Sequence, residues 1–367
     1  MGNFKAIKTI NNSSSSDKYH FRNLVFEGGG VKGIAYVGAL EVLDQEGILK
    51  DIERVAGTSA GAMVAVLIGL GYSAKELEDI LWDIKFKNFL DSDWGVVRNT
   101  KRLLEDYGWY KGDFFRDLMA GYIEKKTGNG ELTFGELKKM RKEGKPYRDI
   151  HLIGADLTTG LSVVFNSELT PKVKIADAAR ISMSIPLFFA AIKGVNNDYH
   201  IYVDGGLLDN YAIKAFDRES FVSNKKNIRH TQYYEKNNEK LNEIKEKTNS
   251  KKAINKFIYN KETLGFRLDS EEEIAMYLDP NAEAPTKEIK SFFTYTKALV
   301  TTLIDFQNNV HLHSDDWQRT VYIDSLGVSA TDFEISDKKK RELVASGRKY
   351  ATSYLEWYNN DEEKANK

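Results

Sequence analysis

The chain has 367 residues, of which 41% are hydrophobic, and its 53 basic and 54 acidic side chains give a formal net charge of −1. A chain of this length can bury a large core in one domain or in two smaller ones, and its balanced charge argues against bulk electrostatic attraction to nucleic acid. The sequence contains no cysteine, which excludes disulfides and thiol catalysis.

The N-terminal segment carries no recognisable targeting signal. It lacks the apolar stretch of about 7–15 residues that defines a signal peptide, and Ala6 stands where a myristoylation motif needs Ser or Thr. Nowhere does the chain approach the roughly 20 consecutive apolar residues that span a bilayer. We therefore expect a cytoplasmic or leaderless-secreted protein whose contact with membranes is peripheral. Residues 1–20, rich in Asn and Ser, are expected to form a flexible leader.

The first predicted strand–helix pair encloses a glycine-rich loop. A strand is predicted at 23–27 and a helix at 34–46, because the apolar residues of the second segment recur at helical spacing. Between them lies GGGVKG, in which Gly28, Gly29 and Gly30 leave successive backbone N–H groups unobstructed. Such groups are candidate donors to an oxyanion.

Other interpretations of this loop are weaker. Gly28, Gly30 and Gly33 also satisfy the dinucleotide motif G-x-G-x-x-G, but the acidic residue expected at the end of the following strand is missing. A phosphate-binding P-loop fails because Ile-Ala at 34–35 stands where Lys and Ser or Thr belong. Lys32 either faces an anionic substrate or caps the loop.

The second strand–helix pair carries a serine motif. A strand is predicted at 53–56 and a nearly all-apolar helix at 60–70, and between them lies GTSAG, with Ser59 at its centre. This G-x-S-x-G pattern at a sharp strand-to-helix turn exposes the serine as a candidate nucleophile, provided that a neighbouring base takes its proton. Without that context, a tight turn of small residues would explain the motif equally well. Two such pairs with short connections predict an α/β fold, with a central, mostly parallel sheet flanked by helices.

An aromatic-rich segment follows at 82–120, where Trp, Tyr and Phe are interleaved with charged residues. A helical subdomain that buries these rings would explain the pattern. A lid or a lipid-facing surface would explain it as well. Both hold for a cap that opens, so the two alternatives stay open.

The alternation typical of a sheet returns after this segment. Strands are predicted at 150–155, 161–165 and 199–203, a helix is predicted at 175–185, and a C-terminal helix is predicted at 338–358. A further amphipathic helix is predicted from Glu288 to Phe306, and the Lys-, Asn- and Glu-rich stretch at 220–262 is interpreted as a solvated insertion or mobile helix.

Asp204 is the leading candidate for the base. It ends the strand at 199–203, and Gly205 and Gly206 let the chain turn away from it. The carboxylate is then expected near the carboxyl edge of the sheet, where open α/β sheets place their sites. An ordinary Asp-Gly turn is the alternative interpretation.

The histidines are weaker candidates. An α/β-hydrolase triad would need His311 or His313, but their surroundings resemble a helix end and not a strand tip. A metal site there lacks a clear third ligand group. His200, on the strand before Asp204, is expected to pack beside the sheet.

The motifs together resemble the patatin-like phospholipases, and in particular the bacterial members of that family. The likeness rests on the order of GGGVKG (28–33), GTSAG (57–61) and DGG (204–206), and it extends to two further stretches, at 155–160 and 180–189. Family members are lipid acyl hydrolases that use a Ser–Asp dyad and no histidine.

The resemblance implies roles for these residues. Ser59 would be the nucleophile, Asp204 its base, and Gly28–Gly30 the oxyanion hole. The expected reaction is hydrolysis of fatty-acyl esters of phospholipids or lysophospholipids through an acyl-enzyme, without metal, calcium or cofactor. The alternatives are a general soluble carboxylesterase and a non-catalytic or partner-activated lipid-binding effector, since some bacterial relatives need a host activator protein.

The expected organisation has four parts. The leader at 1–20 precedes a patatin-like catalytic core at 21–215. A charged insertion with further helices or strands that complete the domain follows at 216–330, and a helical segment at 331–367 ends the chain.

Overall fold

A computed structural model describes most of the chain, namely residues 18–84, 88, 96–195, 199–248, 254–270, 289–290, 294–295, 298–300, 302–303, 315–360 and 366. Most of the predicted leader, most of the predicted helix from Glu288 to Phe306, and both His311 and His313 lie outside the described residues.

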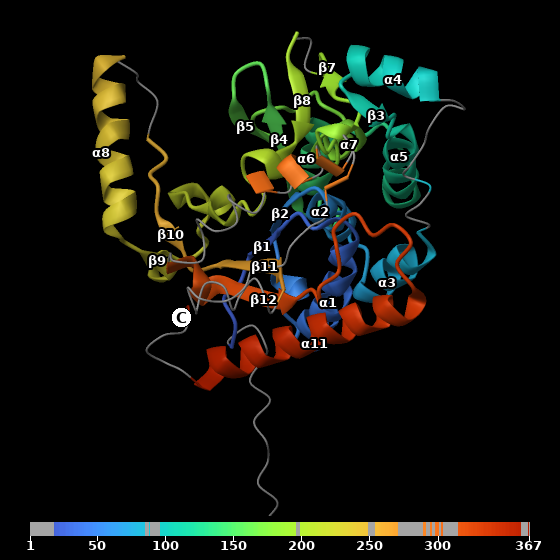
Figure 1. The fold of residues 1–367 in the computed structure, drawn as a ribbon. Coiled ribbons are helices and arrows are strands. Elements are labelled where there is room, and N and C mark those ends of the chain that lie inside the picture. The colour runs from blue at the N-terminus through green and yellow to red at the C-terminus, as the bar shows by residue number, and fades with distance from the viewer. Residues whose placement is uncertain are drawn as a thin grey trace, which may run out of the picture.

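An eight-stranded sheet forms the centre of the molecule, in the order β12-β11-β1-β2-β4-β8-β7, with β5 also paired to β4 (Figure 1). The strands have the following bounds: β1 Asn23–Phe26, β2 Arg54–Thr58, β4 Asp149–Asp156, β5 Leu161–Phe165, β7 Ile192–Lys193, β8 Ile201–Asp204, β11 Thr263–Asp269 and β12 Thr320–Asp324. The five strands from β12 to β4 are parallel, whereas β5, β8 and β7 join antiparallel. The predicted mostly parallel α/β fold is confirmed.

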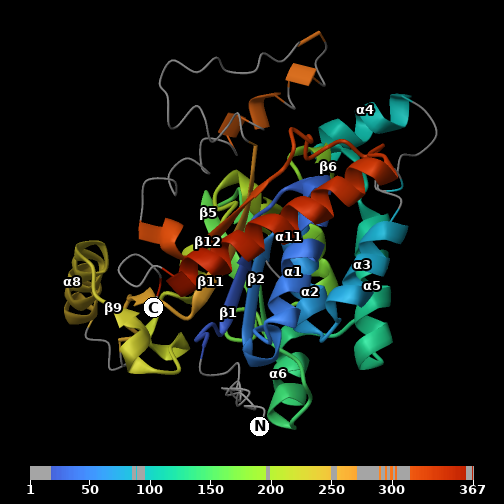
Figure 2. The same cartoon turned by 90° about the horizontal axis from the view of Figure 1, so that it is seen from below.

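Helices cover the sheet, and α11 crosses the outside of α1 (Figure 2). The helices have the following bounds: α1 Ala35–Gln45, α2 Ala60–Gly69, α3 Ala74–Asp83, α4 Val96–Glu105, α5 Asp113–Thr127, α6 Phe134–Lys142, α7 Ile175–Ser182, α8 Gln232–Lys247 and α11 Asp337–Asn360. Every residue of α2 is buried, as its all-apolar sequence predicts. On the opposite face of the sheet, Val25 and Ala56 pack against Tyr211, Ile213 and Phe216.

Most strands and helices that the sequence predicts are confirmed to within a few residues. The predicted helix at 34–46 begins with a 3-10 turn, Gly30–Ile34, which continues directly into α1. The predicted helix at 175–185 ends earlier, at Ser182, and Leu187 follows with a positive φ of 66°. β8 runs antiparallel to β4, and this direction depends on the pairing of the two strands, which no local sequence pattern predicts.

The aromatic segment is only partly buried. It forms α4, α5 and a short strand β3 (Gly108–Tyr110) that pairs with β6 (Leu187–Phe189). Phe115 is buried, whereas Tyr107 is 45% and Phe114 is 37% exposed. Phe86, Phe89, Leu90 and Trp94 lie outside the described residues. Both interpretations of this segment therefore keep some support.

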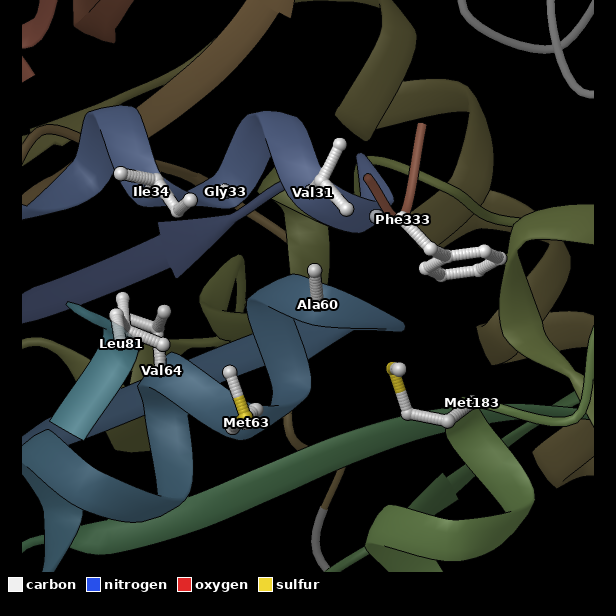
Figure 3. A pocket seen from close by; sticks show the side chains of 10 residues that line it. Val31, Gly33, Ile34, Ala60, Met63, Val64, Leu81, Met183 and Phe333 are labelled. Carbon is white, nitrogen blue, oxygen red and sulfur yellow. The ribbon is translucent and has the colours of Figure 1, made fainter. Parts of the chain in front are cut away.

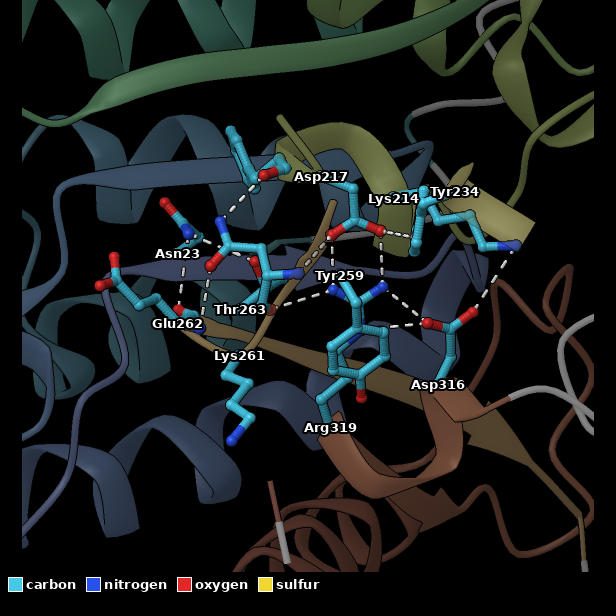
Figure 4. Close-up of polar contacts among 12 residues, drawn as sticks. Asn23, Lys214, Asp217, Tyr234, Tyr259, Lys261, Glu262, Thr263, Asp316 and Arg319 are labelled. Atoms are coloured by element: carbon cyan, nitrogen blue, oxygen red, sulfur yellow. Dashed lines mark hydrogen bonds and ion pairs between the residues drawn. The ribbon is translucent and has the colours of Figure 1, made fainter. Parts of the chain in front are cut away.

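The region beyond residue 216 joins the central sheet through β11 and β12, which lie beside β1. A buried network ties its parts together: Arg319 donates to Asp217 Oδ1 at 2.6 Å and to Asp316 Oδ1 at 2.6 Å (Figure 4). Tyr234 of α8 donates to Asp217, which attaches α8 to this network. The small strands β9 (Ile228–Arg229) and β10 (Tyr259–Asn260) pair beside it. Among the helices that the structure describes, none has the length and apolar content to cross a membrane.

Candidate active site

Ser59 occupies a sharp turn between β2 and α2. Its φ is +54°, a left-handed value that is uncommon for a residue with a side chain. The flanking glycines permit this turn: a Cβ at Gly61 would overlap Phe26 O and lie 2.6 Å from Glu27 O, and a Cβ at Gly57 would overlap the backbone of Gly61. Ser59 is only 6% exposed. The strain and close packing are those of a G-x-S-x-G turn.

The strained turn is held from α7. Ser59 N–H donates to Ser182 Oγ at 2.9 Å, and the Ser182 hydroxyl donates to Ile153 O at 2.6 Å. The next residue, Met183, places its Sδ 3.7 Å from Ser59 Oγ. Both residues belong to the 180–189 stretch, but the sequence alone assigned them no role.

The sheet register brings Asp204 beside Ser59. Thr58 pairs with Ile153 of β4, and the next residue of β4, Gly154, pairs with Asp204 of the antiparallel β8. Asp204 therefore lies level with the residue that follows Thr58, although its strand runs opposite to β2. The sequence predicts Asp204 at this edge, and the antiparallel register explains how it arrives there.

Asp204 is a buried carboxyl group, 2% exposed. Burial raises its pKa from 3.8 to about 7, while hydrogen bonds from the Gly206 N–H and the Ser59 hydroxyl act in the opposite direction. The Gly206 N–H donates to Asp204 Oδ1 at 2.7 Å, and the Asp204 N–H donates to Ser184 O at 2.9 Å. A carboxyl group with a pKa near 7 can accept a proton near neutral pH.

The glycine loop offers two amide donors. Gly28 N–H already donates to Asn210 O at 3.1 Å, whereas those of Gly29 and Gly30 have no acceptor among the described residues. Gly30 has a φ of +54°, and a Cβ there would overlap Ala330 O. The Gly28 N–H is therefore occupied within the fold, and the N–H groups of Gly29 and Gly30 stay as candidate oxyanion donors.

Lys32 has a partner within the fold. Its Nζ donates to Leu268 O at 3.1 Å, near the end of β11. This hydrogen bond favours the interpretation that Lys32 caps the glycine loop. A role of Lys32 in substrate binding stays a prediction.

Two histidines in the described part of the chain, His200 and His151, have partners other than Ser59. His200 Nδ1 is 2.6 Å from Asp156 Oδ2, and its ring stacks near Tyr202, so His200 packs beside the sheet as predicted. His151 lies in the core beside Phe216. Within the ranges that the structure describes, no three His, Cys, Asp or Glu side chains form a group that could hold a metal ion.

An apolar pocket begins beside Ser59. Figure 3 shows Met183 and Phe333 at one end, Ala60 and Met63 of α2 in the middle, and Val64, Ile34 and Leu81 at the other end. The pocket leaves about 20 Å³ for the centres of water-sized molecules, so it is narrow in this structure. Since no lining residue has a polar side-chain oxygen or nitrogen, the pocket suits a hydrocarbon chain.

A family model and named relatives of this chain agree on the family to which it is similar. Residues 24–217 match the family model described as "Patatin-like phospholipase". The chain is similar to the uncharacterized protein YqhO of Bacillus subtilis (strain 168), with 29% identity over 344 residues that cover 90% of this chain and 97% of that protein. It is also similar to the probable lipid hydrolase 463L of Invertebrate iridescent virus 6, with 26% identity that covers 56% of this chain and 67% of that protein.

A solved structure shares the fold. The crystal structure of VipD from Legionella pneumophila superposes with a TM-score of 0.53 at 17% sequence identity, covering 92% of this chain and 67% of VipD. At this identity the likeness supports the fold alone.

Proposed function

The chain belongs to the patatin-like phospholipase family, and from that premise we propose that it cleaves fatty-acyl esters of phospholipids or lysophospholipids through Ser59 and Asp204. The proposal is supported by the sheet register that places Asp204 level with Ser59, by the pKa of Asp204 near 7, and by the strained turn that presents Ser59. The single observation that carries the choice of a lipid substrate is the apolar pocket lined by Ala60 and Met183, which lie next to Ser59.

In the proposed reaction, Asp204 accepts the proton of Ser59 as the hydroxyl attacks the ester carbonyl. The N–H groups of Gly29 and Gly30 donate to the oxyanion, an interaction that strengthens as charge develops. Asp204 then returns the proton to the departing alcohol, and an acyl-enzyme remains on Ser59. A water molecule then gives a proton to Asp204 as its oxygen attacks the acyl carbon, and Asp204 returns that proton to Ser59 Oγ as the bond to the serine breaks and the fatty acid leaves.

The acyl chain of the substrate would occupy the apolar pocket. Ala60, Met63 and Val64 lie on one face of α2, which starts directly after Ser59. A chain attached to Ser59 would follow this face toward Leu81, over about 6 Å of helix between the first and the last of these residues. A general carboxylesterase has no need of such a path.

Because Ser59 and Asp204 are buried, we infer that the residues around them must move before a lipid substrate binds. Ser59 is 6% and Asp204 is 2% exposed, so a phospholipid reaches them only after the surroundings move. The burial of the two residues therefore supports a second candidate function, that of a lipid hydrolase activated by a protein partner or by a lipid surface.

A matched pair of variants tests the proposed substrate. Leu81→Ala enlarges the far end of the pocket, whereas Leu77→Ala makes a comparable cavity one turn earlier in α3, outside the pocket lining. Hydrolysis of p-nitrophenyl esters from acetyl to palmitoyl is measured for both. We expect wild type to prefer long chains over acetyl, and only Leu81→Ala to shift the preference toward longer chains.

An acetyl preference in wild type would instead indicate a general esterase.

The proposed chemistry needs no Lewis acid, so activity is expected to be complete in chelator. Loss of activity in chelator would contradict calcium independence.

A further inference from the structure

Asn210 makes contact with both backbone groups of one residue in the glycine loop. We propose that Asn210 is a positioning residue for the oxyanion donors: it fixes the Gly28 peptide groups and thereby aims the N–H groups of Gly29 and Gly30 at the carbonyl attacked by Ser59. The inference rests on the proposed function and assigns a role to a residue outside the three motifs.

The contact consists of two hydrogen bonds to Gly28. Gly28 N–H donates to Asn210 O at 3.1 Å, and Asn210 Nδ2 donates to Gly28 O at 3.1 Å. Because one residue satisfies the donor and the acceptor of the other, the orientation of the chain at Gly28 is fixed. The two candidate donors follow directly, so a rotation at Gly28 would redirect them.

The space around Gly28 is equally restricted. A Cβ at this position would overlap Asn210 Oδ1 and lie 3.0 Å from Ser59 Cβ. Gly28 is thus enclosed between Asn210 and the nucleophile. The glycine allows the loop to approach Ser59 closely, and Asn210 closes the other side.

The segment from Asp204 to Asn210 reaches all parts of the site. It begins with the proposed base, and Asp209 O accepts a hydrogen bond from Thr58 Oγ1 at 3.1 Å. It ends with the contacts between Asn210 and Gly28. One short segment therefore sets the base, the residue before the nucleophile and the oxyanion loop relative to one another.

Glu27 orients the Asn210 amide. Its Oε1 is 3.4 Å from Asn210 Nδ2, and its Oε2 accepts the Leu268 N–H at 2.7 Å. Arg267 lies beside this carboxylate, with its Nε 3.8 Å from Oε1. Two acceptors, Glu27 Oε1 and Gly28 O, thus face the same amide nitrogen, and only a donor at that position satisfies both.

The test uses the nearly isosteric variant Asn210→Asp, which places an acceptor against these two acceptors. Hydrolysis of a p-nitrophenyl ester and the rate of Ser59 labelling by a fluorophosphonate are measured. We expect kcat and the labelling rate to fall roughly 10–100-fold, as misplaced oxyanion donors do. KM is expected to stay within about twofold, because the acyl pocket is unchanged.

Asn260→Asp is the matched control. Asn260 is also buried, and its Nδ2 donates to Phe216 O at 2.9 Å, but it belongs to the network around Asp217. It is expected to lower the melting temperature and to leave kcat within about twofold of wild type. An equal loss of kcat in both variants, or no loss in Asn210→Asp, would overturn the positioning role.

A double variant separates positioning from charge repulsion. Glu27→Gln combined with Asn210→Asp restores a donor–acceptor pair between the two side chains but returns no donor to Gly28 O. We expect its stability to recover and its kcat to stay low, and recovery of kcat would contradict the proposal. If wild type labels at Ser59 but hydrolyses no ester, the proposed function fails, and the labelling rates still test Asn210.

Discussion

Asp204 meets two opposing demands. In the proposed mechanism it must be ionised to accept the Ser59 proton, but its burial favours the neutral form and raises its pKa to about 7. The Gly206 N–H and the Ser59 hydroxyl partly offset that burial. A carboxylate stabilised only by such hydrogen bonds is more basic than one paired with a cation, which suits proton transfer at neutral pH.

The pH dependence of the rate follows from this pKa. We expect kcat/KM to rise with pH with an apparent pKa of about 7, because only the ionised Asp204 accepts a proton. The measurement is initial rates on a soluble ester from about pH 5 to about pH 9, at an ionic strength held constant. A flat profile across this range would show that Asp204 does not limit the reaction.

The free energy of unfolding should depend on pH through the same raised pKa of Asp204. A carboxyl group whose pKa is raised in the folded state favours folding at low pH, and this contribution is lost as pH rises through about 7. The difference from 3.8 corresponds to about 4 kcal/mol above that pH. Asp204→Asn should therefore stabilise the protein more at pH 8 than at pH 5.

Urea unfolding at both pH values measures this difference. Asp217→Asn is the contrasting variant, because Asp217 is paired with Arg319 and its loss should destabilise the protein at both pH values. An Asp204→Asn effect that does not change with pH would contradict the raised pKa.

At the scale of elements, local pattern was enough to predict β1, α2, β4 and β5, since each is a run of apolar residues with a clear turn at its ends. The direction of β8 was not predictable, because it depends on its register with β4. The Ser59 turn and Asp204 were found because their motifs are contiguous. Ser182 and Asn210 were not, because their contacts join segments far apart in the chain.

The packing of α1 against α11 depends on two glycines. A Cβ at Gly347 would overlap Ala35 O, and a Cβ at Gly38 would overlap Val344 O. Gly347→Ala is therefore expected to destabilise the protein by about 1–3 kcal/mol, because the helices must separate. Gly121→Ala is the control, since Gly121 lies within α5 with no atom within 4 Å of an added Cβ.

The control variant should stabilise the protein by about 0.5–1 kcal/mol through helix propensity. Thermal unfolding of both variants measures the contrast. Equal effects of the two substitutions would mean that the close approach of α1 and α11 adds nothing to stability.

At the scale of the molecule, a buried ion network joins segments a hundred residues apart. Arg319 is fully buried and donates to the carboxylates of Asp217 and Asp316. Replacing it by Met would remove the cation from Asp217 and leave Asp316 with Lys214 Nζ at 3.7 Å, and we expect a loss of about 3–5 kcal/mol. Arg348→Met removes an exposed ion pair with Glu41 and should cost about 1 kcal/mol or less.

Chemical unfolding, with kcat measured on the folded protein, tests this prediction. The network is separate from the contacts of Ser59 and Asp204, so kcat should be unchanged in Arg319→Met where the variant is folded. A loss of stability no larger than that of Arg348→Met would show that the network contributes little.

The whole fold converges on one arrangement: β2 ends at Ser59, β8 ends at Asp204, and β1 ends at the glycine loop. Fatty-acid release from mixed phospholipid vesicles by wild type, Ser59→Ala and Asp204→Asn, in chelator, tests this arrangement most directly. We expect release by wild type and its collapse in both variants. Release that survives in Asp204→Asn, or in Ser59→Ala, would contradict the Ser–Asp dyad.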